Sequence, residues 1–354
     1  MNNFHIEFGS DIDTYSNNNF ISDSKPLTEW LRNAYFFRSA RDALRYIAKS
    51  SNSNRVFIPI LSCESMALPF NQNNYEVIFY PVTENYSIDF DFINNNIKSN
   101  DLLLVANYFG FKDKVTSENE DTKLNTLKTK FGIKIIKDYT HTLKDALYTD
   151  KSNDDFSIFS VRKWASFPDG GILWSKTPIN INFDKYSPEH FNLKKEAMDL
   201  KSKYLQLKDI KIKEKFLELF RKADSLLEAD NNIISMSSYS KELLYKIDFE
   251  KILKIRLEHL KYLEAHSDFI KNYSINTDCN GLYFPIFTDF QKKLQTYLAS
   301  NNIYCPVIWP IDNENKHICE FVNNIISHML AVPCDQRYSY EELDFILNTI
   351  KNFN

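Results

Sequence analysis

The sequence predicts an α/β fold: a large domain built on a mostly parallel sheet, followed by a small α+β domain. Three observations predict it. The 354 residues, 43% of them hydrophobic, can build a substantial core. Short apolar and β-branched runs recur between residues 55 and 176, and the composition then changes to Lys, Leu, Glu and Phe at helical spacing. We place the domain boundary at residue 240, giving a large domain 1–240 and a small domain 241–354.

Six runs in the first half are typical of buried strands because they are apolar, β-branched or aromatic. They are RVFIPI (55–60), YEVIFYPV (75–82), LLLVANYF (102–109), IKIIKDY (133–139), FSIFSV (156–161) and GGILWSK (170–176). The polar segment 112–131 is long enough for a helical crossover between parallel strands. A short loop separates the last two runs, so they can pair directly.

Long helices are expected over Leu193–Asp230 and Lys241–Tyr273, where apolar residues recur at helical spacing. The chain continues with an apolar run at 282–287, a helix-like segment at 291–301, a second apolar run at 303–310 and a final helix over Tyr340–Ile350. This mixture of short apolar runs and helices predicts the compact α+β domain.

Charge and cysteine usage argue against several classes of protein. The net charge is -4, from 43 basic and 47 acidic residues mixed along the chain, so neither nucleic acid nor a membrane is an expected partner. The five cysteines have no C-x-x-C spacing, which argues against a zinc site or a disulfide framework. The N-terminus lacks the pattern of a signal peptide, and no apolar stretch is long enough to span a bilayer. We expect a cytoplasmic protein without a bound metal.

A helix N-terminus is predicted near Ala40. Ser39 precedes a helical run and Asp42 follows three residues later, which is the spacing of a capping box. Free N–H groups and the positive end of the helix dipole suit a phosphate monoester. An ordinary helix start that binds nothing is the alternative.

Two further segments place reactive side chains at strand ends. Asp138 ends an apolar run, at the edge of the sheet where ligands bind in α/β folds, although a solvated turn carboxylate is the alternative. His141 follows it and can equally be structural. A later strand delivers Ser160, Arg162 and Lys163 into a loop that closes on Gly170 and Gly171, two of only six glycines in the chain. Together these segments predict a cofactor pocket.

These motifs resemble the DegT/DnrJ/EryC1/StrS family of pyridoxal-phosphate enzymes, and the likeness in order and spacing covers nearly the whole chain. Matching segments are Ser39-Ala40-Arg41-Asp42-Ala43-Leu44, Pro59 with Ser62, Asn107-Tyr108-Phe109-Gly110, Asp138-x-x-His141, Ser160 with Lys163, Asp169-Gly170-Gly171, and the C-terminal MLAVPCDQRYSYEELDFILNTIK. The resemblance implies the aspartate-aminotransferase fold, called fold type I.

The resemblance also implies roles for individual residues. Lys163 is similar to the lysine that binds the cofactor aldehyde, and Asp138 to the carboxylate that faces the pyridine nitrogen. The remaining cofactor-binding residues by this likeness are Ala40, Arg41, Ser62, His141 and Ser160.

The chain departs from the family pattern at several of these positions. Ala40 replaces a turn glycine, so the backbone there must avoid positive φ or adopt it at a cost. Ser160 lies three residues before Lys163 instead of five, which leaves Ser157 as the fallback phosphate ligand. The segment around Cys63 lacks the usual stacking aromatic, and His141 or Tyr108 is left to contact the cofactor ring.

The resemblance implies an aminotransferase, because family members that dehydrate sugars carry histidine at the position of Lys163. The expected donor is glutamate and the expected acceptor a nucleotide-linked keto sugar for surface polysaccharide or lipopolysaccharide synthesis, in a homodimer with shared active sites. Candidate substrate-binding residues are Tyr108, Arg162, Trp309 and Arg337, with Trp164 as a further lining residue. The alternatives are a smaller phosphorylated carbonyl acceptor, a dehydratase or isomerase, and a non-catalytic binding protein.

Overall fold

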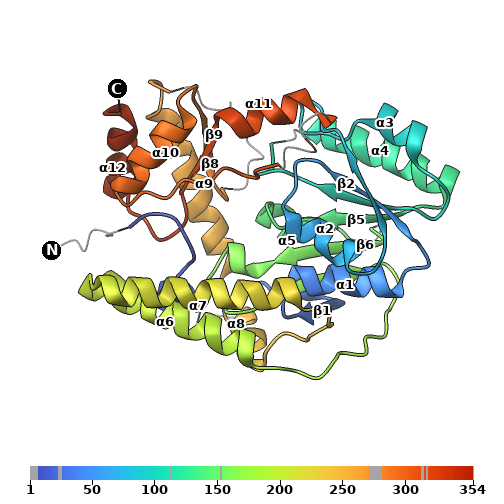
Figure 1. The fold of residues 1–354 in the computed structure, drawn as a ribbon, viewed down its shortest axis with the longest axis horizontal. Helices are drawn as coiled ribbons and strands as arrows, with labels where there is room; N and C mark the ends of the chain where they lie inside the picture. The colour runs from blue at the N-terminus through green and yellow to red at the C-terminus, as the bar shows by residue number, and fades with distance from the viewer. Residues whose placement is uncertain are drawn as a thin grey trace.

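The computed structural model describes residues 7–22, 26–111, 114–151, 154–270, 281–311, 315 and 318–353. Its main feature is a seven-stranded sheet in the order β1-β7-β6-β5-β4-β2-β3 (Figure 1). The strands are β1 (Ala34–Phe37), β2 (Arg55–Pro59), β3 (Glu76–Tyr80), β4 (Leu102–Ala106), β5 (Lys134–Asp138), β6 (Phe156–Ser160) and β7 (Gly171–Ser175).

The sheet is mostly parallel, as predicted. Strands β2 to β6 pair in parallel, whereas β7 runs antiparallel to both β6 and β1. The direct pairing of the last two predicted runs is therefore confirmed. The six predicted strands are all present, and β1, with the sequence AYFF, is an additional strand that was not predicted.

Helices cover both faces of the sheet, which is why β4 is apolar at successive positions. Leu102 and Leu104 face a core shared with α1 (Ala40–Ser50) and α2 (Glu64–Asn71). Leu103 and Val105 face the opposite core, which includes side chains of α3 (Phe90–Asn96) and α4 (Lys114–Phe131). The helix α5 (Leu143–Tyr148) follows β5 and packs near Trp30.

The predicted helix over Leu193–Asp230 is two helices, α6 (Glu189–Leu207) and α7 (Ile210–Ala229), which form an antiparallel hairpin (Figure 1). The break occurs at Lys208, which adopts the left-handed conformation at φ 58°, and Asp209 then caps α7. Likewise, the second predicted helix is divided into α8 (Ser238–Leu244) and α9 (Phe249–Ala265), and residues 271–273 of that prediction lie outside the described residues.

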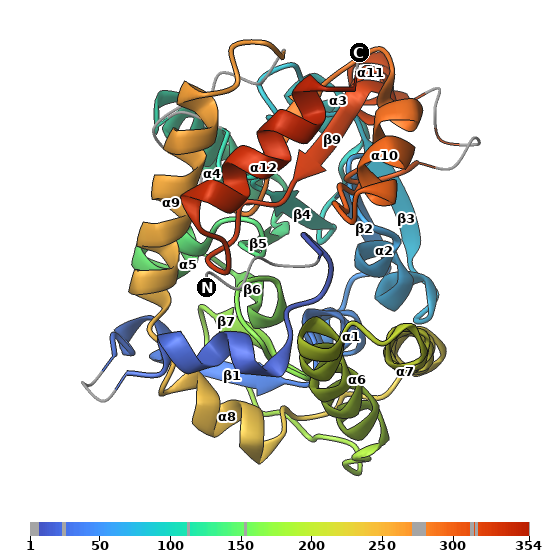
Figure 2. The ribbon, with the colours of Figure 1, turned by 90° about the vertical axis from the view of Figure 1, so that its left-hand side faces the viewer.

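The C-terminal part is α+β, as predicted. The strands β8 (Phe284–Phe287) and β9 (Met329–Val332) pair antiparallel, accompanied by α10 (Gln291–Ser300), α11 (Glu320–His328) and α12 (Tyr340–Lys351). The apolar run 303–310 forms no strand; only Ile303 pairs, in an isolated parallel bridge to Phe8. In Figure 2 the N-terminal segment accordingly passes between α6 and the β9–α12 region. The boundary at residue 240 remains a prediction.

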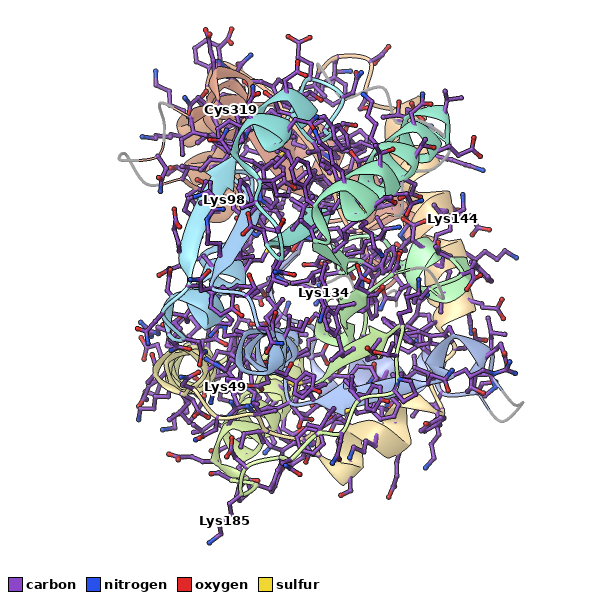
Figure 3. The ribbon with its side chains drawn as sticks, turned by 90° about the vertical axis from the view of Figure 1, so that its right-hand side faces the viewer. Lys49, Lys98, Lys134, Lys144, Lys185 and Cys319 are labelled. Atoms are coloured by element: carbon purple, nitrogen blue, oxygen red, sulfur yellow. The ribbon has the colours of Figure 1, made fainter. Side chains whose placement is uncertain are left out.

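No helix within the described residues is long and apolar enough to cross a bilayer. The lysines labelled in Figure 3 are spread over that face of the molecule, and Lys185 extends away from its lower edge.

Candidate active site

The carboxyl ends of neighbouring strands bring together the residues expected to bind a cofactor. Asp138 is the last residue of β5 and pairs in register with Ile158 of β6. Ser160 ends β6, and the short 3-10 helix η3 (Val161–Lys163) then carries Lys163 past the edge of the sheet. Parallel strands end on the same edge, so Asp138 and Lys163 lie at the same edge of the sheet; their shared role in one site stays a prediction.

Asp138 is held in place by its own turn. Its Oδ1 accepts a hydrogen bond from the backbone N–H of Thr140 at 2.8 Å, and its side chain is buried. Burial raises the pKa of Asp138, while the bond from Thr140 and the charge of Lys163 act in the opposite direction. The carboxylate is therefore desolvated, and a cationic partner nearby would stabilise its ionised form.

Lys163 is exposed in the single chain and lines a cavity of about 250 Å³. The other charged residues that line this cavity are Asp11, Arg162, Arg256, Asp335 and Arg337. Three of the predicted site residues, Arg162, Lys163 and Arg337, therefore share one cavity. Burial acts to raise the pKa of Asp11, but the charges of Lys194, Lys201 and Lys163 lower it overall.

An aromatic layer contains three more predicted residues. The ring of His141 packs against Phe109 and Trp309, with centroid distances of 4.9 Å and 4.8 Å. Trp309 also makes an edge contact of 6.3 Å with Tyr108. Burial, followed by the charge of Lys163, lowers the pKa of His141 to about 3, so its ring is neutral at pH 7. Within the described residues, His141 Nδ1 and the Tyr108 hydroxyl are buried without a hydrogen-bond partner.

The predicted N-terminus of α1 is present and starts at Ala40. Ser39 Oγ accepts a bond from the Asp42 N–H at 3.1 Å. Asp42, however, binds Ser39 Oγ, Arg38 and Arg45 instead of the Ser39 N–H, so the second half of the capping box is absent. Two arginines draw the short carboxylate away from the backbone. Ala40 is not among the described residues with positive φ, so the loss of glycine there causes no strain.

Arg41 lies in the first turn of α1, and part of its guanidinium is buried without a described partner. Its Nε and Nη1 atoms are buried and make no hydrogen bond to any described residue. Burial lowers the pKa of Arg41, and the charges of Arg45 and Arg162 lower it further. A buried guanidinium with unpaired N–H groups is suited to bind an anion.

The three candidate serines, Ser62, Ser157 and Ser160, differ in their contacts. Ser62 follows β2, next to Cys63, whose pKa is raised by burial and is also affected by the charges of Lys163 and Asp138. The fallback residue Ser157 is engaged elsewhere, because its hydroxyl donates to Asp154 Oδ2 at 2.7 Å. Ser157 is thus already bonded within the chain, and Ser160 as the phosphate-binding serine of β6 stays a prediction.

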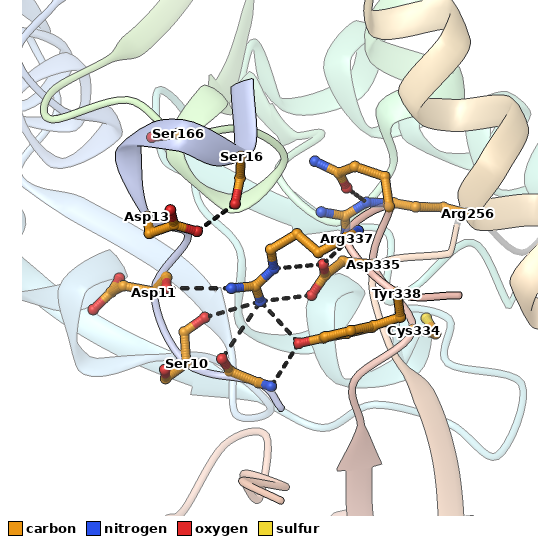
Figure 4. A network of polar contacts seen from close by, with 12 residues as sticks. Ser10, Asp11, Asp13, Ser16, Ser166, Arg256, Cys334, Asp335, Arg337 and Tyr338 are labelled. Atoms are coloured by element: carbon orange, nitrogen blue, oxygen red, sulfur yellow. Dashed lines mark hydrogen bonds and ion pairs between the residues drawn. The ribbon is translucent and has the colours of Figure 1, made fainter. Parts of the chain in front are cut away.

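Arg337 is already paired within the protomer. Its Nε and Nη2 donate to the two oxygens of Asp335 at 2.7 Å and 2.8 Å, and Nη2 also contacts the Tyr338 hydroxyl at 3.1 Å (Figure 4). Burial would raise the pKa of Asp335, but Arg337 holds it well below its usual range. The pair is buried rather than on the surface, and Arg337 would receive a donor carboxylate only by sharing or leaving Asp335.

Trp164, which was predicted to line the acceptor pocket, and Arg256, which was not predicted, contact each other in the core. Trp164 is fully buried, its Nε1 donates to Thr140 O at 2.8 Å, and Arg256 lies 4.7 Å over its ring. Trp164 is therefore a core residue and does not line the cavity. Arg256 was missed, although an arginine among the apolar positions of α9 was a usable signal. Asp11 had no such signal in the sequence, because the N-terminal segment shows no helix or strand pattern.

No protein-family model matches the chain, and no curated protein matches its sequence. Solved structures do match its fold. PseC from Helicobacter pylori, an aminotransferase involved in the biosynthesis of pseudoaminic acid, is 13% identical with a TM-score of 0.66, covering 98% of this chain and 99% of that chain.

Two further structures agree. Spr1654 from Streptococcus pneumoniae, assigned as a sugar aminotransferase and solved in its PLP form, is 14% identical with a TM-score of 0.66 and covers 99% of this chain and 98% of that chain. A DegT DnrJ EryC1 StrS aminotransferase from Brucella abortus is 14% identical with a TM-score of 0.58, covering 95% of this chain and 92% of that chain. The chain therefore has the fold of these aminotransferases over nearly its whole length.

Proposed function

We propose that the protein is a pyridoxal-phosphate-dependent aminotransferase that moves an amino group from glutamate to a keto sugar. One observation carries the proposal: Asp138 and Lys163 lie at one edge of the sheet, close enough for the charge of Lys163 to act on Asp138. A carboxylate for the ring nitrogen and a primary amine for the aldehyde are the pair that this cofactor needs.

The residues present fit the cofactor. The phosphate would be held at the N-terminus of α1, where Ala40 and Arg41 contribute the first helical N–H groups and buried guanidinium atoms of Arg41 have no described partner. The ring would be held by Asp138 and His141, with Ser62 and Ser160 nearby. When bound, the cofactor withdraws electrons from the donor's α-carbon and so makes its proton removable.

The side chains of this chain then have definite tasks. Asp138 Oδ would face the ring nitrogen and hold it protonated, and the positive charge there would offset the desolvation of the carboxylate. Lys163 Nζ, in the solvent-accessible cavity, would take the proton from the donor's α-carbon in the first half of the exchange and would deliver a proton to the acceptor's former carbonyl carbon in the second half. The amino group passes to the acceptor carbonyl, and the donor leaves as a 2-oxo acid.

We further propose that the acceptor is linked to a nucleotide and serves surface polysaccharide synthesis. PseC supports this, since it acts in the biosynthesis of pseudoaminic acid. Tyr108, Trp309 and Arg162 are the proposed acceptor contacts, because Arg162 lines the cavity of Lys163 and the two aromatic residues belong to the layer around His141. The proposal includes a cytoplasmic homodimer, with the second subunit completing each site.

Absorbance spectroscopy tests the proposal. Wild-type protein with pyridoxal phosphate should form a yellow band that glutamate bleaches. Lys163→Ala should lack the band and lose about 10²- to 10⁴-fold in turnover, the range for a positioned proton-transfer group. Lys185→Ala is the matched control, because this exposed lysine extends into solvent (Figure 3).

Failure has a clear form. If saturating cofactor gives no band that depends on Lys163, the enzyme proposal is wrong and a non-catalytic binding protein becomes the leading reading. If the band forms but glutamate does not bleach it, the donor assignment is wrong. Acceptor consumption without stoichiometric loss of donor would instead indicate a dehydratase or isomerase.

A further inference from the structure

Three side chains beside α1 carry buried polar atoms without partners. These atoms are Arg41 Nε and Nη1, Arg162 Nε, and both ring nitrogens of His190, and none of them has a hydrogen-bond partner among the described residues. His190 is only 2% exposed. Buried polar groups are hydrogen-bonded in the large majority of cases, so three of them together call for a ligand.

The local charge shows the sign of that ligand. His190 lies within the field of four cations, Arg162, Arg38, Lys194 and Arg41. Arg38 is neutralised by Asp42 and Asp230, and Lys194 by Asp224. Arg41 and Arg162 form no ion pair with a described residue; Asp11 and Asp169 act on Arg162, and Glu228 acts on Arg41, only at longer range. The cluster therefore lacks a directly paired counter-ion and suits an anion.

Two helices from different parts of the chain, α1 and α6, contribute residues to the cluster. Arg41 belongs to the first turn of α1, an eleven-residue helix whose N-terminal N–H groups are available beyond the capped Asp42. His190 belongs to the first turn of α6. The helix α6 is fixed to the N-terminal segment, because Asp199 accepts from Thr14 Oγ1 and Ser202 Oγ donates to Asp13, each at 2.7 Å. Arg162 lies between Ser160 and Lys163 in the chain and links the anion cluster to the reactive lysine.

We propose that His190, with Arg41 and Arg162, forms a phosphate clamp on the N-terminus of α1, so that α6 contributes a residue to the cofactor site of its own chain. The inference rests on the proposed function, because the phosphate is taken to be that of pyridoxal phosphate. A phosphate dianion supplies several acceptor oxygens, which matches an arrangement of donors without partners. Inorganic phosphate shares this chemistry and is a direct probe.

The clamp predicts a proton-linked affinity. Without an anion, burial and the charge of Arg162 lower the pKa of His190 to about 2, so its ring is neutral at pH 7. A bound dianion cancels the field of Arg162, Arg38, Lys194 and Arg41 and raises that pKa, since opposite charge favours the protonated ring. Phosphate binding should therefore take up more protons in wild type than in a variant without His190.

Calorimetry on cofactor-free protein tests the clamp, with inorganic phosphate, pyridoxamine 5′-phosphate and pyridoxamine as ligands in two buffers of different ionisation enthalpy. His190→Ala should weaken both phosphate ligands about tenfold, the effect of removing a charge-assisted hydrogen bond of about 1.4 kcal/mol. It should leave pyridoxamine unaffected and reduce proton uptake. His190→Gln, which keeps a donor, should restore most of the affinity, and exposed His266→Ala is the matched control.

Each alternative result has a different meaning. If His190→Ala binds both phosphate ligands within twofold of wild type, the clamp is wrong and His190 is a packing residue. If wild type does not bind phosphate, the clamp is also wrong, whatever the cofactor spectrum shows. Strong phosphate binding that needs His190, without a Lys163-dependent band, would retain the clamp and overturn the proposed enzyme. Should His190→Ala unfold, His190→Phe, which fills the space without a hydrogen-bond donor, carries the same comparison and should lose the affinity that His190→Gln keeps.

Discussion

Arg337 lines the cavity of Lys163, but its positive charge is already paired with a carboxylate of the same chain. Its guanidinium pairs with both oxygens of Asp335, and it also approaches the carbonyl oxygens of Gly9, Ser10 and Asp11 at 3.4 to 3.5 Å (Figure 4). Binding a donor carboxylate would bring a second anion beside Asp335. The geometry of the single chain thus favours a positioning role for this pair, and donor binding by Arg337 remains a prediction.

Asp335→Asn is expected to destabilise the fold in a pH-dependent way. Removing one member of a buried ion pair costs about 3–5 kcal/mol, because Arg337 stays buried without its partner. The pKa of Asp335 is lowered in the folded state, so its stabilisation is present above the unfolded pKa of about 3.9 and fades as pH falls through the lower folded value. Urea unfolding at pH 7 and at pH 3 should show the gap between wild type and variant shrinking at the lower pH.

The control for this comparison is Asp289→Asn, whose side chain is 90% exposed. It should change the unfolding free energy by less than about 0.5 kcal/mol. A wild-type-to-Asp335→Asn gap that is equally large at both pH values would show that the loss comes from packing and not from the charge of Asp335.

At the scale of elements, the position of α1 depends on a glycine in another element. Gly171 begins β7, and a Cβ atom there would lie 2.1 Å from Ser39 C and 2.3 Å from Ala40 N. The close approach of β7 to the first turn of α1 is possible only without a side chain. This contact sets the distance between Lys163, which precedes β7, and the N–H groups proposed to bind phosphate.

Gly171→Ala should therefore separate β7 from α1. Overpacking of this kind costs about 1–3 kcal/mol, and the displaced N-terminus should also bind pyridoxamine 5′-phosphate more weakly. Thermal unfolding and ligand titration measure the two effects. Gly132→Ala is an informative control, because Gly132 has positive φ but no atom within 4 Å of an added Cβ. If both variants lose stability while ligand affinity is unchanged, the β7–α1 contact does not position the site.

The elements that the sequence predicted are those whose pattern reflects local burial. The central strands are buried on both faces, and their sequences are continuous apolar runs. Ser39, the N-cap residue, predicted the start of α1. The structure departs from prediction where tertiary contacts decide. The apolar run 303–310 packs its side chains without strand pairing beyond Ile303, and the break at Lys208 has no glycine or proline to mark it.

The residues of the candidate site likewise divide into those that the sequence could predict and those that depend on tertiary contacts. Asp138 and Lys163 could be predicted because strand ends of a parallel sheet converge on one edge. His190 could not, because a histidine in a polar helical stretch has no local signal, and its burial depends on how α6 docks. The pairing of Arg337 with Asp335 is local, because the residues are two apart in the chain and the Arg337 N–H also donates to Asp335 Oδ1; the approach of Arg337 to Gly9 and Asp11 could not be predicted.

At the scale of the whole molecule, the N-terminal segment Glu7–Asp13 joins regions that are distant in sequence. Glu7 is buried and pairs with Lys201 of α6 at 3.2 Å and Lys213 of α7 at 2.8 Å. Phe8 bridges to Ile303, and its ring stacks on Phe345 at 5.6 Å. The segment then places Asp11 in the cavity of Lys163. It therefore ties the α6–α7 hairpin, the C-terminal elements and the reactive centre together.

Phe8→Ala should release this segment locally before it unfolds the molecule. The side chain is 2% exposed, and its removal should cost about 3–5 kcal/mol. The amides of Phe8 and Tyr304, which bond to Asn302 O and Phe8 O at 2.9 Å each, should exchange hydrogen faster, whereas amides in β4 and β5 should keep much of their protection because they belong to the central sheet. Phe8→Leu, which retains most of the buried area, should behave closer to wild type. Equal acceleration of exchange in the bridge and in the sheet would mean that the segment and the sheet unfold as one unit, so that closure of the Lys163 cavity is inseparable from global stability.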